Sequence, residues 1–318
     1  MDYVRISDAH RSGKLTLSFE LFPPRDELAE KRLFETALPA MEALGPDFMT
    51  CTYGAGGSTR DKTLEVVTRV KQQTGIEAAC HLTCVGSSRD EIRAFAERTL
   101  EAGITNIVAL RGDPPQGDTA FRPHPDGFHY AADLVRFLKQ IADFDIAMAG
   151  YPEGHPECAD KHLDWQRCRD KIEAGAELII TQLFYDLNDF YEFDDYMKNK
   201  LGVDVPIVPG ILPILNGPQI RRFCGMCGAK LPKNVSDKLD SFGDDKASAR
   251  AYGVELATQM CEALIAHGVP GFHFYTLNQV LSTREVLENL RLDCPSAEER
   301  PRPAVQSWVG KVGVGRDT

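Results

Sequence analysis

Short apolar segments alternate with longer amphipathic segments along most of this chain, and this alternation limits the possible folds more than any other feature. Eight segments have the length and the alternating apolar pattern of β-strands. They cover residues 15–22, 47–53, 77–84, 105–111, 145–151, 177–184, 205–212 and 271–277. Helical patterns follow these strands at residues 30–44, 59–74, 89–102, 130–141, 163–174, 187–201, 219–267 and 282–290.

A strict order of strand and helix favours a parallel α/β sheet, and eight such units favour a sheet closed into a TIM (β/α)8 barrel. A doubly wound open sheet is the alternative architecture. Four helices end at a glycine that can adopt the left-handed cap conformation; these glycines are Gly45, Gly103, Gly175 and Gly268. We predict one barrel domain over residues 1–294. We expect residues 295–318, rich in proline, glycine and charge, to form an extended or partly disordered tail.

Three irregularities modify this barrel. Pro209 lies inside the seventh strand, where it cannot donate a backbone hydrogen bond, so we expect a bulge there. The connections 113–128 and 213–267 are longer than a barrel needs, and the second makes an extended link between the seventh and eighth strands. Both connections follow strands, so they lie on the face where barrels carry their active sites.

Composition and charge exclude several classes of function. The chain has 36 Lys and Arg against 47 Asp and Glu, a net charge of −11, which argues against a nucleic-acid partner. No apolar run approaches the roughly 20 residues that span a bilayer, and the N-terminus lacks the apolar core of a signal peptide. We therefore expect a cytoplasmic protein with no membrane partner.

The cysteines indicate neither a disulfide framework nor a metal site. They number nine, an odd count, and are scattered along the chain, which is typical of reduced thiols. The one close pair, Cys224 and Cys227, has no further ligands at a comparable spacing. A helical location without a metal is the expected state of this pair.

Glu20 is the strongest candidate for acid–base chemistry. Alternation along the first strand places Thr16, Ser18, Glu20 and Phe22 toward the barrel interior, and the odd-numbered leucines and Phe19 toward the helices. An interior carboxylate beside aromatic rings loses hydration and is suited to donate a proton near neutrality. The alternative is a structural carboxylate paired with Arg or Lys.

Other strand ends carry polar residues of weaker signal. The second strand leads through Thr52 into a glycine-rich turn, which either approaches an anion or is a plain tight turn capped by Ser58 or Thr59. His81 in the third strand is a histidine that more often fills a core than takes part in chemistry. Arg111 and Asp113 flank a glycine after the fourth strand and either hold a polar ligand from two sides or form a local ion pair.

The fifth and sixth units add a charged helix face and an inward amide. Asp164, Arg167 and Lys171 share one helical face, which either holds a diphosphate and a ribose or is simply solvated. Gln182 is expected to share the interior face with Leu178, Ile180 and Phe184, where its amide could meet a flat heterocycle. Together with the aromatic eighth strand, these groups suit a large planar cofactor with a diphosphate and a second flat ligand, and they contain no Ser-His-Asp triad.

Seven motifs, one per strand end and in register, resemble the methylenetetrahydrofolate reductase family over about residues 15–290. They are SFELFPP at 18–24, TYGA at 52–55, HLTC at 81–84, LRGD at 110–113, YPEGHPE at 151–157, ITQLF at 180–184 and HFYTLN at 273–278. The resemblance implies an FAD-dependent enzyme that works by a ping-pong cycle. NADH or NADPH would reduce the flavin and leave, and methylenetetrahydrofolate would then be reduced to 5-methyltetrahydrofolate. A homo-oligomer is expected.

The resemblance also implies roles for individual residues. Glu20 would protonate N10 of the folate, and Asp113 would contact the pterin and tune the flavin. Substrate-binding positions are Asp113, Gln182, Gln279 and Tyr275. Positions that line FAD in the family are Thr52, Tyr53, Ala55, His81, Arg111, Gly112, Asp113, Ala131, Tyr151, His155, Asp164, Arg167 and Lys171.

The chain departs from the family pattern at two positions. Gln279 stands where the family usually has arginine, and Gly217 stands where bacterial members tend to have an aromatic residue. These departures bear on the grip on the folate tail and on the packing of nicotinamide. We expect no counterpart of the regulatory domain of animal members. Two other hypotheses are a flavin-free barrel that binds pterin for methyl transfer and a degenerate barrel that only binds.

Overall fold

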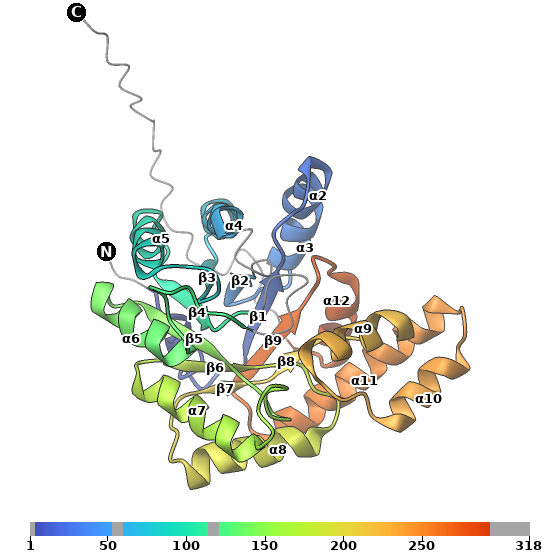
Figure 1. Ribbon diagram of the computed structural model, residues 1–318. Helices are drawn as coiled ribbons and strands as arrows, with labels where there is room; N and C mark the ends of the chain where they lie inside the picture. Colours follow the sequence, from blue (N-terminus) through green and yellow to red (C-terminus); the bar gives the residue numbers. More distant parts are fainter. Residues whose placement is uncertain (1–3, 53–59, 114–120, 293–318) are drawn as a thin grey trace, which may run out of the picture.

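The computed structural model describes residues 4–52, 60–113 and 121–292, and its strands form one parallel sheet (Figure 1). The strands are β1 (Thr16–Leu21), β2 (Phe48–Cys51), β3 (Glu77–Thr83), β4 (Asn106–Leu110), β5 (Asp145–Gly150), β6 (Leu178–Thr181), β7 (Ile207–Val208), β8 (Gly210–Ile211) and β9 (Gly271–Tyr275). Their order in the sheet is β7-β6-β5-β4-β3-β2-β1-β9-β8. This order follows the chain without the reversal of a doubly wound sheet, so the TIM barrel is confirmed and the open sheet is wrong.

The barrel closes at Pro209. β7 pairs with β6 and β8 pairs with β9, so the two short strands are the halves of one predicted seventh strand. Pro209 between them has no N–H, but its carbonyl accepts a hydrogen bond from the His273 amide at 3.0 Å. The Gly210 amide turns instead to the Thr181 hydroxyl at 2.9 Å. The expected irregularity at Pro209 is present, but it divides the strand into two short strands and does not form a bulge.

Two apolar cores lie on the two faces of the sheet. The larger core joins the strands to the surrounding helices and contains Phe19 and Leu21, as the alternation of β1 predicted. The inner core fills the barrel with smaller side chains; its members are Ile6, Phe48, Ala79, Val108, Ala147, Leu178, Ile180 and Val208. Both faces of a barrel sheet are buried, which explains the nearly continuous apolar character of several strands.

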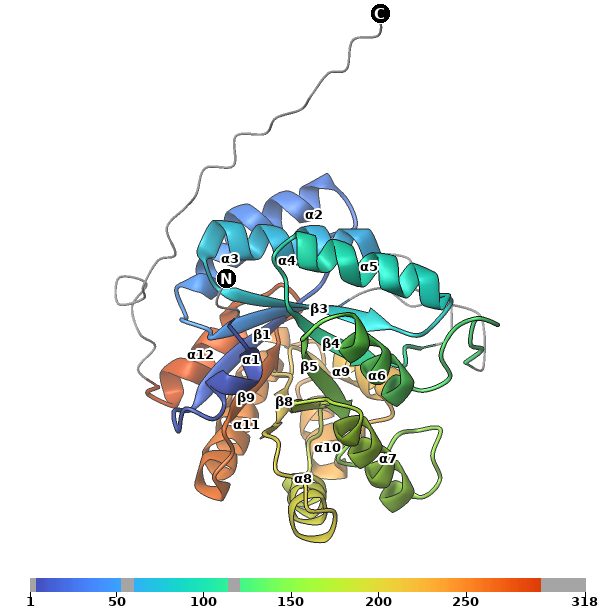
Figure 2. The ribbon, with the colours of Figure 1, turned by 90° about the vertical axis from the view of Figure 1, so that its left-hand side faces the viewer.

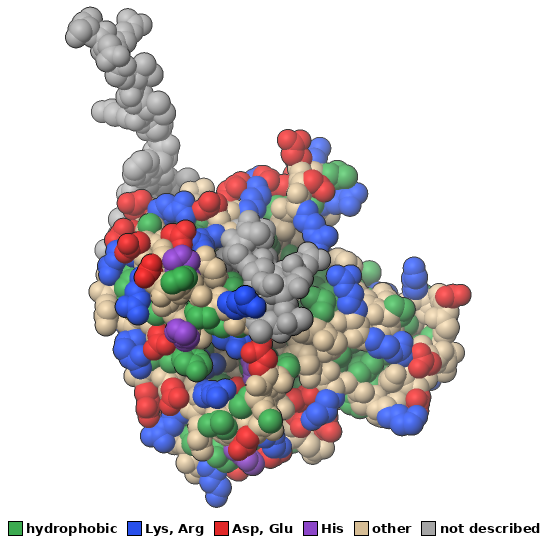
Figure 3. Space-filling view, viewed as in Figure 1, with side chains coloured by type: hydrophobic (Ala, Val, Ile, Leu, Met, Phe, Trp, Pro, Cys, Tyr) green, Lys and Arg blue, Asp and Glu red, His purple; other side chains and the backbone are tan. Residues whose placement is uncertain are grey.

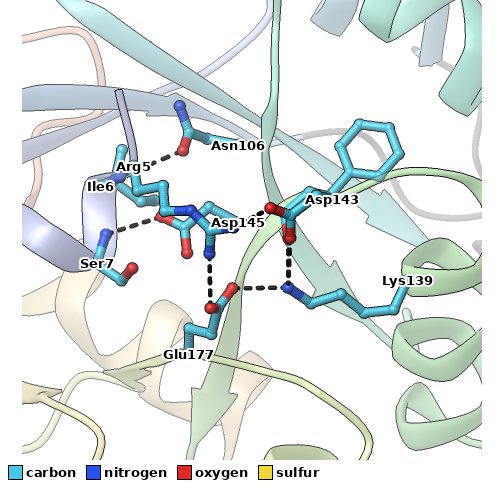
Figure 4. A network of polar contacts seen from close by, with 9 residues as sticks. Arg5, Ile6, Ser7, Asn106, Lys139, Asp143, Asp145 and Glu177 are labelled. Carbon is cyan, nitrogen blue, oxygen red and sulfur yellow. Dashed lines mark hydrogen bonds and ion pairs between the residues drawn. The ribbon is translucent and has the colours of Figure 1, made fainter. Parts of the chain in front are cut away.

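A short helix that the sequence did not reveal, α1 (Ile6–Ala9), closes the N-terminal end of the barrel (Figure 2). Ile6 is part of the inner core, and its amide donates to Asn106 Oδ1 at 3.2 Å. The Ser7 amide donates to Asp145 Oδ2 at 2.8 Å. Figure 4 shows these bonds beside the ion pairs that Arg5 makes with Asp143 and Glu177.

The barrel helices match the predicted ones, except that several are divided. They are α2 (Glu27–Arg32), α3 (Leu38–Glu42), α4 (Arg60–Thr74), α5 (Arg89–Glu101), α6 (Ala131–Ile141), α7 (Lys161–Glu173), α8 (Leu187–Asp195) and α12 (Leu281–Asn289). A π-helical segment, Leu33–Ala37, joins α2 to α3, and another, Tyr196–Lys200, extends α8. The four predicted glycine caps all have positive φ, from +69° at Gly45 to +116° at Gly175, and are confirmed.

The long connection after the seventh strand is three helices rather than one region. They are α9 (Gly217–Cys227), α10 (Lys233–Ser241) and α11 (Lys246–His267). Gly228 ends α9 in the left-handed conformation, and Pro232 precedes α10, so the breaks occur where the residues favour them. The tail 295–318 and residues 114–120 of the first long connection lie outside the described residues.

Three expectations about composition can be compared with the described residues. Eight of the nine cysteines lie in them, and all eight are free thiols. Within the same ranges, no group of three or more side chains is arranged to hold a metal ion. None of the helices there is long and apolar enough to cross a membrane.

Candidate active site

Glu20 lies near the carboxyl end of β1 and points into the barrel mouth, with only 8% of the residue exposed. Two imidazole rings approach its carboxylate: His81 Nε2 lies 3.5 Å and His273 Nε2 lies 3.7 Å from Glu20 Oε2. Within the described parts of the chain, no Arg or Lys lies within ion-pair distance of this carboxylate. The structural alternative for Glu20, a pairing with Arg or Lys, is therefore wrong for these residues.

The two histidines differ in how they are held. His273 Nδ1 lies 2.8 Å from the Ser18 hydroxyl, and this hydroxyl donates to the Phe272 carbonyl. The His273 ring is therefore held by a hydrogen bond to β1. Neither ring nitrogen of His81 has a hydrogen-bond partner among the described residues. Burial lowers the pKa of His81 to about 4, although the Glu20 carboxylate opposes this shift. His81 is therefore a neutral ring at neutral pH, with unused hydrogen-bonding capacity facing the mouth.

Gln182 follows β6 directly and lies at the same mouth. The Gln182 backbone amide donates to the Gly150 carbonyl at 2.7 Å, and the side-chain Oε1 accepts from the Leu183 backbone amide at 2.8 Å. Its predicted neighbours Leu178 and Ile180 belong to the inner core, as expected.

The prediction that Phe184 shares this face is wrong. Phe184 stacks on Phe190 of α8, with ring centroids 5.2 Å apart, in the core between strands and helices. The strand ends at Thr181, so the alternation that would have turned Phe184 inward no longer applies.

Arg111 lies after β4 in a bidentate ion pair. Its guanidinium meets the Glu157 carboxylate at 2.6 and 3.0 Å and lies over the Phe121 ring. This pair lowers the pKa of Glu157, because the cation stabilises the carboxylate. Asp113 is exposed two residues further on. A local ion pair between Arg111 and Asp113, one of the two alternatives for these residues, is not what the structure has; Arg111 pairs with Glu157 and so joins two neighbouring strand ends.

Gly112 between them has a φ of +89°, and its Cα lies against Thr83. A Cβ at this position would meet Thr83 Cβ at 2.8 Å, so only glycine allows the β4 end to pass this close to β3.

The residues after β5 form a compact polar cluster with α7. The Asp164 carboxylate is buried and accepts from the His155 amide at 3.0 Å. The Lys171 ammonium donates to the Ala149 carbonyl at 2.7 Å, and the Tyr151 and His155 rings meet edge to face at 4.7 Å. Asp164 and Lys171 thus face the barrel instead of the solvent, whereas Arg167 is exposed.

The remaining predicted positions are distributed around the same rim or fall outside the described residues. Thr52 is bonded through its carbonyl to the Thr63 hydroxyl at 2.9 Å, and Ala131 opens α6. Tyr53 and Ala55 lie outside the described residues, as does the glycine-rich turn around them. Lys, Arg, Asp and Glu side chains are interspersed over the face in Figure 3, so local donors would have to hold an anionic ligand there.

The turn after β9 carries contacts that the sequence did not assign. The Tyr275 hydroxyl donates to the Thr181 carbonyl at 2.6 Å, and the Thr276 hydroxyl donates to the Glu20 carbonyl at 2.8 Å. Asn278 bonds both backbone groups of Phe22. Only the clustering of polar residues at this strand end could have indicated these contacts.

Comparisons with known proteins show the family of the chain. The family model described as methylenetetrahydrofolate reductase matches residues 5–291. The chain belongs to the methylenetetrahydrofolate reductase family. The 5,10-methylenetetrahydrofolate reductase of Pectobacterium carotovorum is 41% identical, covering 85% of this chain and 88% of the relative. That of Escherichia coli is 40% identical over 87% of this chain and 91% of the relative.

A plant relative and a solved structure extend the comparison. Methylenetetrahydrofolate reductase (NADH) 1 of Zea mays is 39% identical over 94% of this chain, which spans 52% of that relative's length. A Clostridium thermocellum protein described as binding two copies of 5-methyl-5,6,7,8-tetrahydrofolic acid has a TM-score of 0.64 at 17% identity. The alignment covers 89% of this chain and 96% of that one, and it supports the barrel fold.

The two departures from the methylenetetrahydrofolate reductase pattern lie at different places on the rim. Gln279 is exposed just after the β9 turn. Gly217 begins α9, and a Cβ there would lie 2.9 Å from Arg221 Nη1. Arg221 is itself bonded to Ser236 and Asp240 of α10. Space next to Gly217 is thus used by an arginine that joins α9 to α10.

Proposed function

We propose that this chain reduces 5,10-methylenetetrahydrofolate to 5-methyltetrahydrofolate, with electrons taken from NADH or NADPH through a bound FAD. Membership of the family supports the overall reaction. The observation that carries the proposal within the molecule is Glu20, a buried carboxylate at the barrel mouth that two imidazoles approach and that no Arg or Lys of the described residues neutralises. Such a group can hold a proton and deliver it to a ligand above it.

The residues at the mouth fit a flavin dinucleotide. Arg111, Lys171 and the exposed Arg167 would supply cations for a diphosphate. The unpartnered nitrogens of His81 offer a donor and an acceptor toward a polar ring edge. When bound, FAD supplies the chemistry of accepting a hydride from the nicotinamide and passing it to the one-carbon bridge of the folate.

Glu20 would perform the proton transfer of the folate half-reaction. Its carboxyl proton passes to N10 of the folate, the N10–C bond breaks, and the bridging carbon becomes an iminium at N5 that accepts the hydride. An unprotonated amine is a poor leaving group, and the closed ring is a poor hydride acceptor, so the acid is required. One proton is consumed in each turnover, and the Glu20 carboxylate regains it from solvent.

Gln182 and Asp113 would orient the pterin. Because Gln182 Oε1 accepts from the Leu183 amide, its side-chain NH₂ is the group left to donate to a pterin acceptor. Asp113 is exposed at the β4 end, where its carboxylate could accept from pterin N–H groups. In the nicotinamide half-reaction, the same Gln182 amide would face the carboxamide of the nucleotide.

A reconstitution experiment tests this proposal against the flavin-free methyltransferase. The purified chain, incubated with FAD and desalted, should retain a yellow chromophore that NADH or NADPH bleaches without oxygen. Methylenetetrahydrofolate should then restore the oxidised spectrum and yield methyltetrahydrofolate. A chain that does not retain FAD but transfers a methyl group from methyltetrahydrofolate would overturn the proposal in favour of the flavin-free barrel. A chain that binds folate and catalyses neither reaction would indicate a degenerate barrel.

A further inference from the structure

The turn after β9 has an unfavourable backbone at two consecutive residues. Leu277 has a φ of +52° and Asn278 a φ of +56°, and neither residue is glycine. Residues other than glycine rarely adopt this left-handed backbone conformation, and two adjacent examples persist only where surrounding contacts fix them. The contacts that fix this turn should therefore be found nearby.

One set of contacts connects the turn to the strand that carries Glu20. The Asn278 side-chain amide donates from Nδ2 to the Phe22 carbonyl and accepts at Oδ1 from the Phe22 amide, both at 2.9 Å. The Thr276 hydroxyl donates to the Glu20 carbonyl at 2.8 Å. The backbone that follows the Glu20 side chain, from the Glu20 carbonyl to Phe22, is thus bonded to one turn across 256 residues of sequence.

A second contact connects the start of the same turn to β6, the strand that Gln182 follows. The Tyr275 hydroxyl donates to the carbonyl of Thr181, the residue before Gln182, at 2.6 Å. Gly210 makes this contact possible, since a Cβ at that position would lie 2.6 Å from Tyr275 Cε2 and 2.2 Å from the Thr181 oxygen. The division of the seventh strand at Pro209 therefore leaves a passage that Tyr275 occupies.

We infer that the turn Tyr275–Asn278 is a positioning element that sets Glu20 and Gln182 at a fixed separation, with Asn278 and Thr276 as positioning residues for Glu20. This inference rests on the proposed function, because it assigns the turn to the proton transfer. An acid delivers its proton only within hydrogen-bond reach of the receiving atom, and a small displacement of its strand end moves it out of reach. The nicotinamide half-reaction does not use that proton, so it should not depend on the bonds that Thr276 and Asn278 make to the strand of Glu20.

Variants at Thr276 test the inference without altering a strained residue. Thr276→Val removes the bond to the Glu20 carbonyl, and Thr276→Ser keeps it. We expect the valine variant to slow the folate half-reaction by about tenfold or more and to leave flavin reduction by NADH or NADPH within about twofold. The serine variant should recover most of the loss. The control is Thr99→Val, which removes a buried hydroxyl from α5 far from the mouth.

Two variants at Asn278 separate the effect of its two bonds to Phe22 from the effect of its strained backbone. Asn278→Ala loses both bonds to Phe22 and keeps the strained backbone, whereas Asn278→Gly loses the bonds and relieves the strain. If positioning is the role, both variants lose the folate half-reaction by about tenfold to a hundredfold. A glycine variant with normal folate reduction would overturn the inference, because strain alone would then explain the turn. Equal losses in the two half-reactions would overturn it as well.

Hydrogen exchange gives a readout on the chain without any ligand. In Asn278→Ala the Phe22 amide loses its acceptor, so it should exchange faster than in the parent, and the Thr99→Val control should leave it unchanged. If the Phe22 amide exchanged at the parental rate in the alanine variant, the positioning role of Asn278 would be contradicted. If the parent protein itself fails to reduce folate, the proposed function fails; if the parent is active and the Thr276 and Asn278 variants match it, only this inference fails.

Discussion

The two ends of the barrel each bury a carboxylate, and the two carboxylates have different partners. At the closed end, Asp145 is 1% exposed and accepts from the Ser7 amide at 2.8 Å, beside a network of ion pairs around Arg5 (Figure 4). At the open end, Glu20 is nearly as buried, and among the described residues only two imidazoles approach its carboxylate, at 3.5 and 3.7 Å. The closed end bonds one carboxylate oxygen to a backbone amide and leaves Asp145 Oδ1 without a partner among the described residues, whereas the carboxylate at the mouth is approached by imidazoles alone.

The same contrast appears in the histidines of the two ends. At the closed end, His10 shares a hydrogen bond with the Thr16 hydroxyl through Nδ1, its Nε2 has no partner among the described residues, and its ring meets Phe48 edge to face. At the mouth, His81 keeps both ring nitrogens unpartnered among the described residues. Buried polar groups without partners are costly, and His273 Nε2 is a further one beside Glu20, so a polar ligand bound at the mouth would lower this cost.

The largest expected effect comes from removing the acid at the open end. Glu20→Gln keeps the shape of the side chain and removes the transferable proton. We expect the folate half-reaction to slow by about a hundredfold to ten-thousandfold, with flavin reduction by the nicotinamide nucleotide unchanged. Anaerobic single-turnover measurements of each half-reaction check this. Equal damage to both half-reactions would contradict the role given to Glu20.

The corresponding change at the closed end should affect stability and not turnover. Asp145→Ala leaves the buried Ser7 amide without an acceptor, so we expect a loss of about 1–3 kcal/mol in the free energy of unfolding. Asp145→Asn keeps an acceptor oxygen and should cost much less, because burial already raises the pKa of this carboxyl and disfavours its charge. Urea denaturation of the two variants measures the difference. An alanine variant with parental stability would show that α1 is not held by this bond.

Acid should destabilise both ends through their buried histidines. Burial lowers the pKa of His10 and of His81 to about 4, below the ordinary value of 6.5. The unfolded chain therefore takes up protons first as the pH falls, and stability that is complete above about pH 6.5 is lost progressively toward pH 4. Between about pH 7 and pH 5, each histidine should contribute up to about 2 kcal/mol of this loss.

Asparagine substitutions isolate this effect from the titration of carboxylates. His10→Asn and His81→Asn should each flatten the pH dependence of the unfolding free energy relative to the parent, measured without ligands. Thermal denaturation at several pH values provides the comparison. An unchanged slope in both variants would mean that the acid sensitivity lies elsewhere.

The sequence was sufficient for the features that depend on local pattern. The strands and most helices follow from apolar periodicity, and the inward direction of Glu20 follows from alternation along β1. The same rule failed at Phe184, because β6 ends at Thr181 and alternation does not continue past a strand. The four-residue helix α1 is too short to leave a periodic signal.

Partner choice between distant residues could not be predicted. The Ser18–His273 bond joins residues 255 apart, and the Asn278–Phe22 bonds join residues 256 apart, across the seam where the first and last strands meet. A local pair with Asp113 was one alternative for Arg111, which instead pairs with Glu157, 46 residues away. These contacts depend on the register between strands, which a single sequence specifies only through the complete fold.

The smallest expected effect concerns the outer rim of the mouth, where the chain departs from its family. Gln279 is exposed, so Gln279→Arg restores the family's usual guanidinium at a position where an ion pair is screened by solvent. Such a pair contributes about 0.2–1 kcal/mol, so we expect at most about a fivefold lower KM for a folate with a glutamate tail. The change should fade at high salt, and it should be smaller in Gln279→Lys, which lacks the planar fork of arginine. Steady-state kinetics with a substrate that carries the tail and with one that lacks it test this prediction. An equal change in KM for both substrates would mean that position 279 does not contact the tail. The rim would then differ from Glu20 and Gln182 in kind, as a surface that tolerates substitution around a mouth that does not.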